Sequence, residues 1–501
     1  MSILTLRSIS FAFDDSDKII IDHLNASFSH GWTGLIGPNG CGKSTLLQIL
    51  AGRLRVTSGE MQGIPELIHL CEQETLRPPA TLESFRNSDD KSAIRTKSAL
   101  SLHELLMKEW EQMSCGEQKR WQLGCSLWQS PDLLLIDEPT NHLDQKNRDV
   151  ILDALGSYRG TGIVVSHDRD LLQKLCQKFI FFVGSHTYEM SGSYDEARNN
   201  LAEHFAYNEK QRENSFKKAA SLRKEVSRIR QLTESSKKRL SKGHLNRKDH
   251  DSKAKIDGAR LSGKDASLGK KKGALENRIK KIEQSTHDLA VVKDYSGSVF
   301  FDIPASYTKV LLHQTNVRIS LPDASVLSAT ELLLKSGEKI GITGFNGTGK
   351  SSLIEHCLKE SWIKSENYLY LRQELNTDEI DVIRKKLNFL SKEEYSRCLQ
   401  IIARLGSDPK QVFKSHRWSA GEIRKIAIAI AIVTEAELLI LDEPGNHLDI
   451  LSVERLEDAL KKSNLTLLVI SHDSRFIRSV CSIFWNIQKD QNGNSILKQT
   501  D

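Results

Sequence analysis

The chain has 501 residues, of which 39% are hydrophobic and 27% charged, so it can bury the cores of two or three ordinary domains; its formal net charge is +6. No apolar run approaches the roughly 18–20 residues that a membrane-spanning helix needs, and the start does not resemble a signal peptide. Eight cysteines without a CxxC pair argue against a zinc or iron–sulfur site. We therefore expect a cytoplasmic protein with no membrane-spanning segment.

The first 52 residues predict a strand, a glycine-rich turn and a helix. TGLIG (33–37) has the composition of a short buried strand, and LLQILAG (46–52) that of the following helix. Between them, GPNGCGKST (37–45) matches the pattern GxxxxGK[ST], whose glycines let backbone N–H groups face phosphates at a helix N-terminus. We expect this loop to hold a nucleotide through Gly37, Asn39, Gly40, Gly42, Lys43, Ser44 and Thr45.

Two weaker signals come next. Gln73 follows Lys43 by 30 residues and is placed to sense Mg²⁺ and an attacking water. SCGEQ (114–118) begins a helical pattern with a hydroxyl and a glycine. This start suits anion binding through Ser114 and Gly116, although an ordinary N-cap with Glu in the first turn has the same composition.

An acidic pair and a histidine complete this half of the chain. LLLID (133–137) is a continuous apolar run, as in a strand buried on both faces of a parallel sheet, and it ends in Asp137 followed by Glu138. We expect Asp137 to hold Mg²⁺, Glu138 to accept a proton from the attacking water, and His167, in VVSHD (164–168), to contact the γ-phosphate. The alternative is that one carboxylate merely caps the next turn.

The same motifs recur in the second half of the chain as GFNGTGKSS (344–352), LLILDEPGNHLD (438–449) and VISHD (469–473). The spacing is also repeated, because 94 residues separate Lys43 from Asp137 and 92 separate Lys350 from Asp442. We therefore predict two copies of one doubly wound α/β P-loop domain, at residues 1–197 and 298–501.

Each candidate residue of the first copy has a counterpart in the second. The second nucleotide-binding set is Gly344, Asn346, Gly347, Gly349, Lys350, Ser351, Ser352, Gln373, Ser419 and Gly421, with Glu443 and His472 as catalytic residues. The Mg²⁺ ligands that we expect at the two sites are Ser44, Gln73 and Asp137, and Ser351, Gln373 and Asp442.

These motifs resemble the ATP-binding cassette superfamily over about 400 of the 501 residues. In that family two cassettes pack head to tail, and ATP lies between the phosphate loop of one and the signature of the other. The resemblance implies that Lys43 faces Ser419 and Gly421, and that Lys350 faces Ser114 and Gly116.

Three features qualify or narrow that resemblance. The signatures read MSCGE and WSAGE, so Cys115 and Ala420 replace the usual first glycine. The family also stacks an aromatic residue on adenine, a role that falls to Phe13, whereas the matching region 320–322 has no aromatic residue. EPTNHLD (138–144) is similar to the ABC-F class, whose members are soluble ATPases that act on ribosomes.

The segment between the two copies is strongly basic. Residues 201–285 contain 24 Lys or Arg and 11 Asp or Glu, a net charge of +13, which leaves −7 for the rest of the chain. Apolar residues recur at helical spacing, at Leu222, Val226, Ile229 and Leu232 and at Leu268, Leu275, Ile279 and Ile282. We predict a helical hairpin at 198–297 with a basic tip at 237–264, the alternative being a solvated charged linker.

The ABC-F resemblance gives this hairpin a role. It implies insertion through the ribosomal tRNA exit site toward the peptidyl-transferase centre, with the +7 tip on rRNA and near P-site tRNA. The expected function is a monomeric ATPase that binds the ribosome when closed on ATP and leaves after hydrolysis. It would serve antibiotic protection or translation regulation. The alternatives are an ATPase subunit of an ABC importer and a DNA-acting cassette protein.

Overall fold

The structure is a computed structural model that describes residues 3–13, 19–75, 77–105, 108–141, 143, 145–184, 186–239, 264–287, 309–322, 325–345, 347–361, 363, 367–414, 418–434, 436–446, 448–490 and 493–500. The chain divides into two compact units. One holds Met1–Ala197 together with Asp294–Asp501, and the other holds Arg198–Lys293. Asn346 and most of the basic tip, 240–263, lie outside the described residues.

The N-terminal copy is built on two sheets among its described residues. The smaller has the order β2-β1-β4, and the larger the order β5-β6-β7-β3-β8-β9, in which only β9 runs antiparallel to its neighbour. The strands are β1 (Leu4–Ala12), β2 (Ile19–Phe28), β3 (Gly31–Ile36), β4 (Ser58–Gln62), β5 (Ile68–Cys71), β6 (Leu133–Asp137), β7 (Thr161–Val165), β8 (Lys178–Val183) and β9 (His186–Ser191).

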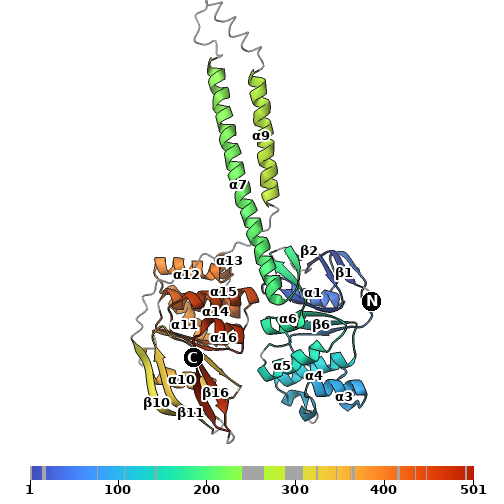
Figure 1. Cartoon of the computed structure of the whole chain (residues 1–501), viewed down its shortest axis with the longest axis vertical. Coiled ribbons are helices and arrows are strands. Elements are labelled where there is room, and N and C mark those ends of the chain that lie inside the picture. The colour runs from blue at the N-terminus through green and yellow to red at the C-terminus, as the bar shows by residue number, and fades with distance from the viewer. Residues whose placement is uncertain are drawn as a thin grey trace, which may run out of the picture. The chain divides into compact units, whose positions relative to one another are not determined.

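Helices surround the larger sheet of this copy (Figure 1). The α1 helix packs toward β6, and the core between them contains Leu46, Leu47, Leu133 and Leu135. These helices are α1 (Lys43–Leu50), α2 (Leu82–Asn87), α3 (Lys91–Ala99), α4 (Cys115–Trp128), α5 (Gln145–Gly156) and α6 (Arg169–Leu175), with 3₁₀ turns at His103–Leu105 and Trp110–Gln112.

The C-terminal copy has a single sheet of order β10-β11-β17-β16-β12-β15-β14-β13 within the described residues, and β12, β15, β14 and β13 are parallel. Its strands are β10 (Val310–Ser320), β11 (Val326–Lys335), β12 (Lys339–Gly344), β13 (Tyr368–Leu371), β14 (Leu438–Asp442), β15 (Leu467–Ile470), β16 (Ile483–Lys489) and β17 (Ser495–Thr500). Its helices are α10 (Lys350–Glu360), α11 (Thr377–Asn388), α12 (Lys392–Arg404), α13 (Pro409–Lys414), α14 (Ala420–Val433), α15 (Ile450–Lys462) and α16 (Ser474–Val480).

The predicted α/β class is confirmed, and the parallel strands place the motifs at one edge of each sheet. LLLID and LLILD form β6 and β14, whose residues are all buried. Such strands carry no polar face because helices cover both sides of a parallel sheet. The carboxyl ends of β3, β6 and β7 meet at one edge in the N-terminal copy, as do those of β12, β14 and β15 in the C-terminal copy.

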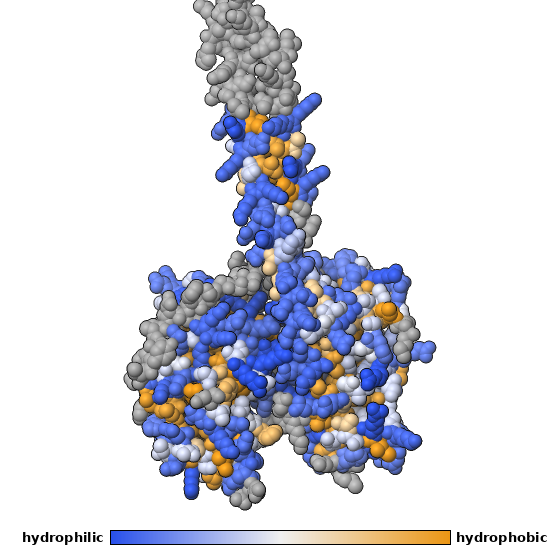
Figure 2. Space-filling model, viewed as in Figure 1, coloured by the Kyte–Doolittle hydropathy of each residue, from blue (hydrophilic) through white to orange (hydrophobic). Residues whose placement is uncertain are grey.

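The segment between the copies contains two long helices, α7 (Tyr194–Arg239) and α9 (Lys264–His287), which run side by side (Figure 1). Ile229 of α7 and Ile279 of α9 are buried, whereas most neighbouring charged residues are exposed. Ion pairs join Arg223 to Glu283 and Lys271 to Glu225. Figure 2 shows apolar residues gathered along these helices between charged ones. The pair therefore has the apolar stripe that its sequence period predicts.

Candidate nucleotide sites

Both phosphate loops use glycines where the backbone requires them. Gly42 and Gly349 precede α1 and α10 with φ of 98° and 93°, in the left-handed region that side chains with a Cβ rarely adopt. A Cβ at Gly42 would also lie 2.9 Å from Ile20 Cγ2. The loop can therefore curl into the N-terminus of a helix, where backbone N–H groups and the helix dipole favour an anion.

The two loop lysines fold back over their own loops. Lys43 Nζ donates to the carbonyl oxygens of Gly37 at 2.7 Å and Pro38 at 2.9 Å. Lys350 Nζ donates equivalently to Gly344 at 2.9 Å and Phe345 at 3.1 Å. Each ammonium group is therefore held over the loop that the sequence assigns to phosphates.

The acidic pairs stand at the ends of β6 and β14. Glu138 and Glu443 have φ of 46° and 49°, an uncommon conformation for residues other than glycine. Their backbone N–H groups donate to Val165 and Ile470 on the adjacent strands, each at 2.8 Å. This turn aims each carboxylate toward the next strand end, and such strained positions concentrate at functional sites.

Each glutamate meets the histidine that the sequence pairs with it. His167 N donates to Glu138 Oε2 at 3.1 Å, and His167 Nε2 lies 3.3 Å from Glu138 Oε1. His472 N donates to Glu443 Oε2 at 3.3 Å, and its Nε2 lies 3.7 Å from Glu443 Oε1. The repeated geometry brings a candidate base and a candidate phosphate contact together in both copies.

Burial shifts the ionisation of these groups. It raises the pKa of Glu138 to about 8 and that of Glu443 to about 7, and it lowers the pKa of His167 to about 4. Burial also raises the pKa of Asp137 and Asp442, partly offset at Asp137 by a hydrogen bond from Ser44. Carboxylates with a pKa near neutrality suit general-base chemistry.

These shifts predict a pH-dependent stability. Because the folded pKa of each glutamate exceeds its ordinary value of 4.5, the folded state keeps a proton that the unfolded state loses, and stability falls as pH rises from about 4.5 toward 8. The Glu138→Gln/Glu443→Gln variant does not titrate there. In nucleotide-free, EDTA-treated protein, the free energy of unfolding of the variant should therefore rise relative to that of the native chain as pH increases. The expected difference is up to about 1.4 kcal/mol per pH unit for each glutamate replaced. Melting curves at pH 5 and pH 8.5 test this, and an advantage that is equal at both pH values contradicts the predicted titration.

The first cleft, of about 580 Å³, gathers candidate residues from both copies. Its lining includes Ser419 and Gly421 of the C-terminal copy. The candidate residues that it takes from the N-terminal copy are Asn39, Gly40, Gly42, Lys43, Ser44, Thr45, Gln73, Asp137, Glu138 and His167. The signature of one copy therefore faces the phosphate loop of the other.

The second cleft, of about 440 Å³, is composed differently. The N-terminal copy contributes Leu143 and Arg148 to it, and Ser114 and Gly116 are not among its lining residues. Its candidate residues are Gly347, Gly349, Lys350, Ser351, Ser352, Gln373, Asp442, Glu443 and His472. Ser114 and Ser419 each cap a helix with a full capping box, so both also show the alternative N-cap arrangement.

Three further candidates do not line either cleft. Gly37 has no room for a Cβ, which would lie 2.7 Å from Phe182 Cβ, and Gly344 has φ of 153°. Phe13 is 46% exposed and packs edge-on against Phe11 at a centroid distance of 5.0 Å. The structure does not bring Phe13 to the first cleft, and its role in adenine stacking stays a prediction.

The oxygen atoms at the first cleft fit Mg²⁺. Ser44, Gln73 and Asp137 all line this cleft. Within the described part of the chain, no group of three or more His, Cys, Asp or Glu side chains could hold a metal ion by itself. One carboxylate and one hydroxyl are nevertheless typical of Mg²⁺ sites in which substrate phosphates supply further ligands.

Two buried cations that sequence reasoning missed connect the signature helices to the sites. Lys119 of α4 donates to the carbonyl oxygens of Glu72 at 2.5 Å and Gln73 at 3.4 Å. Arg424 of α14 donates to Glu443 O at 2.7 Å and also to Gln373 O. Both residues follow the signature serine by five positions, which is the sequence signal that could have identified them.

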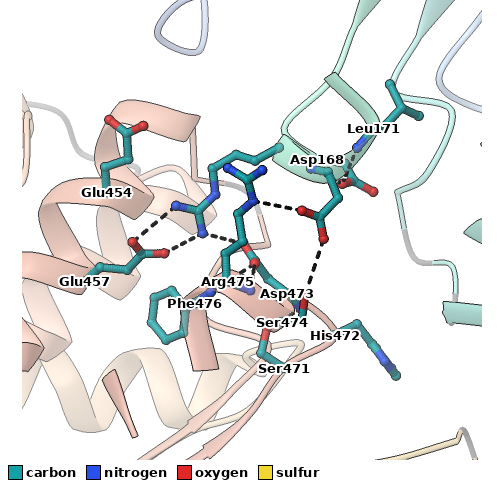
Figure 3. Close-up of polar contacts among 12 residues, drawn as sticks. Asp168, Leu171, Glu454, Glu457, Ser471, His472, Asp473, Ser474, Arg475 and Phe476 are labelled. Carbon is teal, nitrogen blue, oxygen red and sulfur yellow. Dashed lines mark hydrogen bonds and ion pairs between the residues drawn. The ribbon is translucent and has the colours of Figure 1, made fainter. Parts of the chain in front are cut away.

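A polar network joins the two copies beside the sites (Figure 3). Arg169 Nη1 donates to Glu457 Oε2 at 3.1 Å, and its Nη2 donates to Glu457 Oε1 and to Asp473 Oδ2. Arg475 Nε donates to Asp170 Oδ1 at 2.8 Å, and Nη1 to Asp195 Oδ1 at 3.0 Å. Arg169 and Asp170 closely follow His167, and Asp473 and Arg475 closely follow His472, so the network joins the segments after the two histidines.

Comparison with known proteins identifies the two repeated domains. The family model described as ABC transporter matches residues 21–141 and 327–446. The ribosome protection protein VmlR of Bacillus subtilis is 28% identical over 487 residues, covering 95% of this chain and 85% of VmlR. ABC transporter F family member 4 of Arabidopsis thaliana is 26% identical over 546 residues, covering 94% of this chain and 72% of that protein. The chain therefore carries two ATP-binding cassettes and is similar to proteins of the ABC-F class.

Two further likenesses extend over nearly the whole chain. The erythromycin resistance ATP-binding protein MsrA of Staphylococcus epidermidis is 28% identical over 506 residues, covering 97% of both chains. A solved structure of the archaeal ribosome recycling factor aABCE1, in complex with stalk protein aP1, shares the fold with a TM-score of 0.62 at 18% identity, covering 98% of this chain and 89% of that one.

These matches settle the general chemistry. The two copies are ATP-binding cassettes, and the chain is an ATP-hydrolysing enzyme. The sequence predictions of tandem cassettes and of ATPase activity are confirmed. Among the described residues, no helix combines the length and the apolar composition needed to cross a bilayer.

Proposed function

We propose that this ABC-F ATPase is a cytoplasmic, monomeric clamp on the ribosome. It binds in its ATP-closed state, inserts the linker through the tRNA exit site toward the peptidyl-transferase centre, and dissociates after hydrolysis. The observation that carries the proposal is the similarity along almost the whole chain to VmlR and MsrA, one named for ribosome protection and the other for erythromycin resistance. ATP drives the switch if it binds the closed state more tightly.

The proposed chemistry uses the same residue types in each cassette. Lys43 and Lys350 bind β- and γ-phosphate oxygens, and Glu138 and Glu443 accept the proton of the attacking water at a carboxylate oxygen. His167 and His472 contact the γ-phosphate, while Gln73 and Gln373 orient the water. Mg²⁺, bound with Ser44 and Asp137 or with Ser351 and Asp442, would neutralise charge on the phosphates.

The proposed ribosome contact lies on the linker. Its tip, 237–264, carries ten basic and three acidic residues and no aromatic residue, which favours rRNA phosphates over base stacking, with P-site tRNA nearby. We favour a role in protecting the ribosome against an antibiotic. Regulation of translation is the other role that ABC-F relatives suggest.

Deleting residues 240–263 should abolish ribosome binding while leaving ATP hydrolysis by the cassettes intact. We expect the deletion variant to hydrolyse ATP at its basal rate but to lose stimulation by purified 70S ribosomes. We also expect the binding of the intact chain to ribosomes to weaken steeply with salt. A deletion variant that is still stimulated contradicts the linker role. ATPase activity stimulated by membrane fractions instead of ribosomes would favour an importer subunit.

A further inference from the structure

One arginine reaches from the first cassette into the second site. Arg148 of α5 lines the second cleft together with Lys350, Glu443 and His472. Its Nη1 donates to the carbonyl oxygen of His472 at 3.3 Å. This is a contact between cassettes, made at the backbone of the residue proposed to meet the γ-phosphate.

The contact forms a short chain that leads to the candidate base. His472 accepts from Arg148 through its carbonyl oxygen and donates from its backbone N–H to Glu443 Oε2 at 3.3 Å. Arg148 therefore contacts the backbone of the residue whose own N–H meets Glu443. The His472 ring points away from Glu457 (Figure 3).

Arg148 is in turn held on its own cassette. Its Nε lies 3.7 Å from Asp168 Oδ2, and the Arg148 side chain is 23% exposed. The Asp168 carboxylate caps α6 by accepting from the N–H groups of Asp170 and Leu171 (Figure 3). The Nε atom itself is buried and makes no hydrogen bond within the described residues. The guanidinium is therefore placed between the histidine segments of both cassettes.

The first site lacks this arrangement. Arg148 follows Asp144 by four residues, and the residue that follows Asp449 by four is Val453. Val453 lines the first cleft, where its side chain can donate no hydrogen bond to the His167 segment. Although Arg148 lines both clefts, its side-chain hydrogen bond within the described residues goes to the second site.

We propose that Arg148 is a positioning residue that acts in trans: it orients the His472–Glu443 pair and supports turnover at the second nucleotide site, but not at the first. The inference rests on the proposed hydrolysis at both sites and adds an asymmetry between them. A donor that holds the backbone of a reacting segment acts on geometry, and small misplacements of catalytic groups cost rate steeply.

The test reads the two sites separately in the full-length protein. Vanadate trapping of 8-azido-ATP labels a cassette only when that cassette hydrolyses the nucleotide. Trypsin cleavage in the lysine-rich stretch 237–264 then separates the labelled cassettes. For Arg148→Ala we expect the ratio of second-cassette to first-cassette label to fall about tenfold, with labelling by azido-ATP before hydrolysis unchanged in both.

Two variants control for a merely structural role. Arg148→Lys keeps a donor for the His472 carbonyl and should restore the ratio to within about threefold of the native chain. Arg475 lines neither cleft, and Arg475→Ala removes the two ion pairs that it makes with Asp170 and Asp195 of the other cassette. This variant should leave the ratio unchanged. If Arg148→Ala lowers both labels equally, or neither, the proposal for Arg148 is overturned. A native chain that traps label in the first cassette alone contradicts both this proposal and two-site hydrolysis.

Discussion

Replacing Glu138 and Glu443 together by glutamine should lower ATP turnover by about 10²–10⁴-fold, the usual contribution of a positioned general base. Both carboxylates are buried at strand ends, bonded to the following histidine segment, and have a pKa raised by burial to about 8 and about 7. Glutamine keeps the shape of the side chain and its carbonyl oxygen but cannot accept the proton.

Phosphate release measures this loss, and ATP affinity should change little, because the loop residues that hold phosphate are untouched. Glu83→Gln/Glu213→Gln is the matched control, since both of these glutamates are exposed and lie away from the clefts. Turnover that persists within a few-fold in the double variant would remove the two glutamates from the proposed mechanism.

The second large effect is expected at Arg169. Its side chain is 7% exposed, and its guanidinium binds both oxygens of Glu457 and one of Asp473, across the interface between the cassettes. Arg169→Ala leaves the largely buried Glu457 carboxylate without this partner, and breaking one side of a buried ion pair typically costs about 3–5 kcal/mol. We therefore expect a marked fall in the melting temperature of the nucleotide-free chain.

A double-mutant cycle isolates this interaction. Arg169→Met/Glu457→Met removes both charges, and most of the lost stability should return, because the cost comes from an uncompensated charge. Arg230→Ala is the control, since it breaks an exposed pair with Glu234 that is worth at most about 0.5 kcal/mol. If Arg169→Ala destabilises no more than Arg230→Ala, the network contributes little to holding the cassettes together.

The sequence revealed those parts of the site that depend on local pattern. Gly42 and Lys43 are set by the turn into α1, and Asp137 and Glu138 by the end of a buried strand, so motif and hydrophobic period predict their places. The apolar period of α7 and α9 likewise predicts which residues, such as Ile229 and Ile279, are buried.

Contacts between residues far apart in the chain left no such signal. Arg148, Arg169 and Arg475 act across the interface on residues roughly 290 to 325 positions away, and nothing near them distinguishes them from surface arginines. Lys119 and Arg424 could have been found, because both copies place a cation at the same point of the signature helix. We expected Ser114 and Gly116 to line the second site, but they do not line its cleft. Whether they face Lys350 depends on how the cassettes close on each other, and a local sequence pattern carries no information about that arrangement.

Sedimentation of the Glu138→Gln/Glu443→Gln variant with purified 70S ribosomes tests the central claim most directly. With ATP, the variant should comigrate with ribosomes and stay bound through the gradient, because it cannot reopen. Without ATP, or with residues 240–263 deleted, it should remain at the top. An ATP-bound variant that stays at the top despite native affinity for ATP would contradict the proposed ribosome clamp.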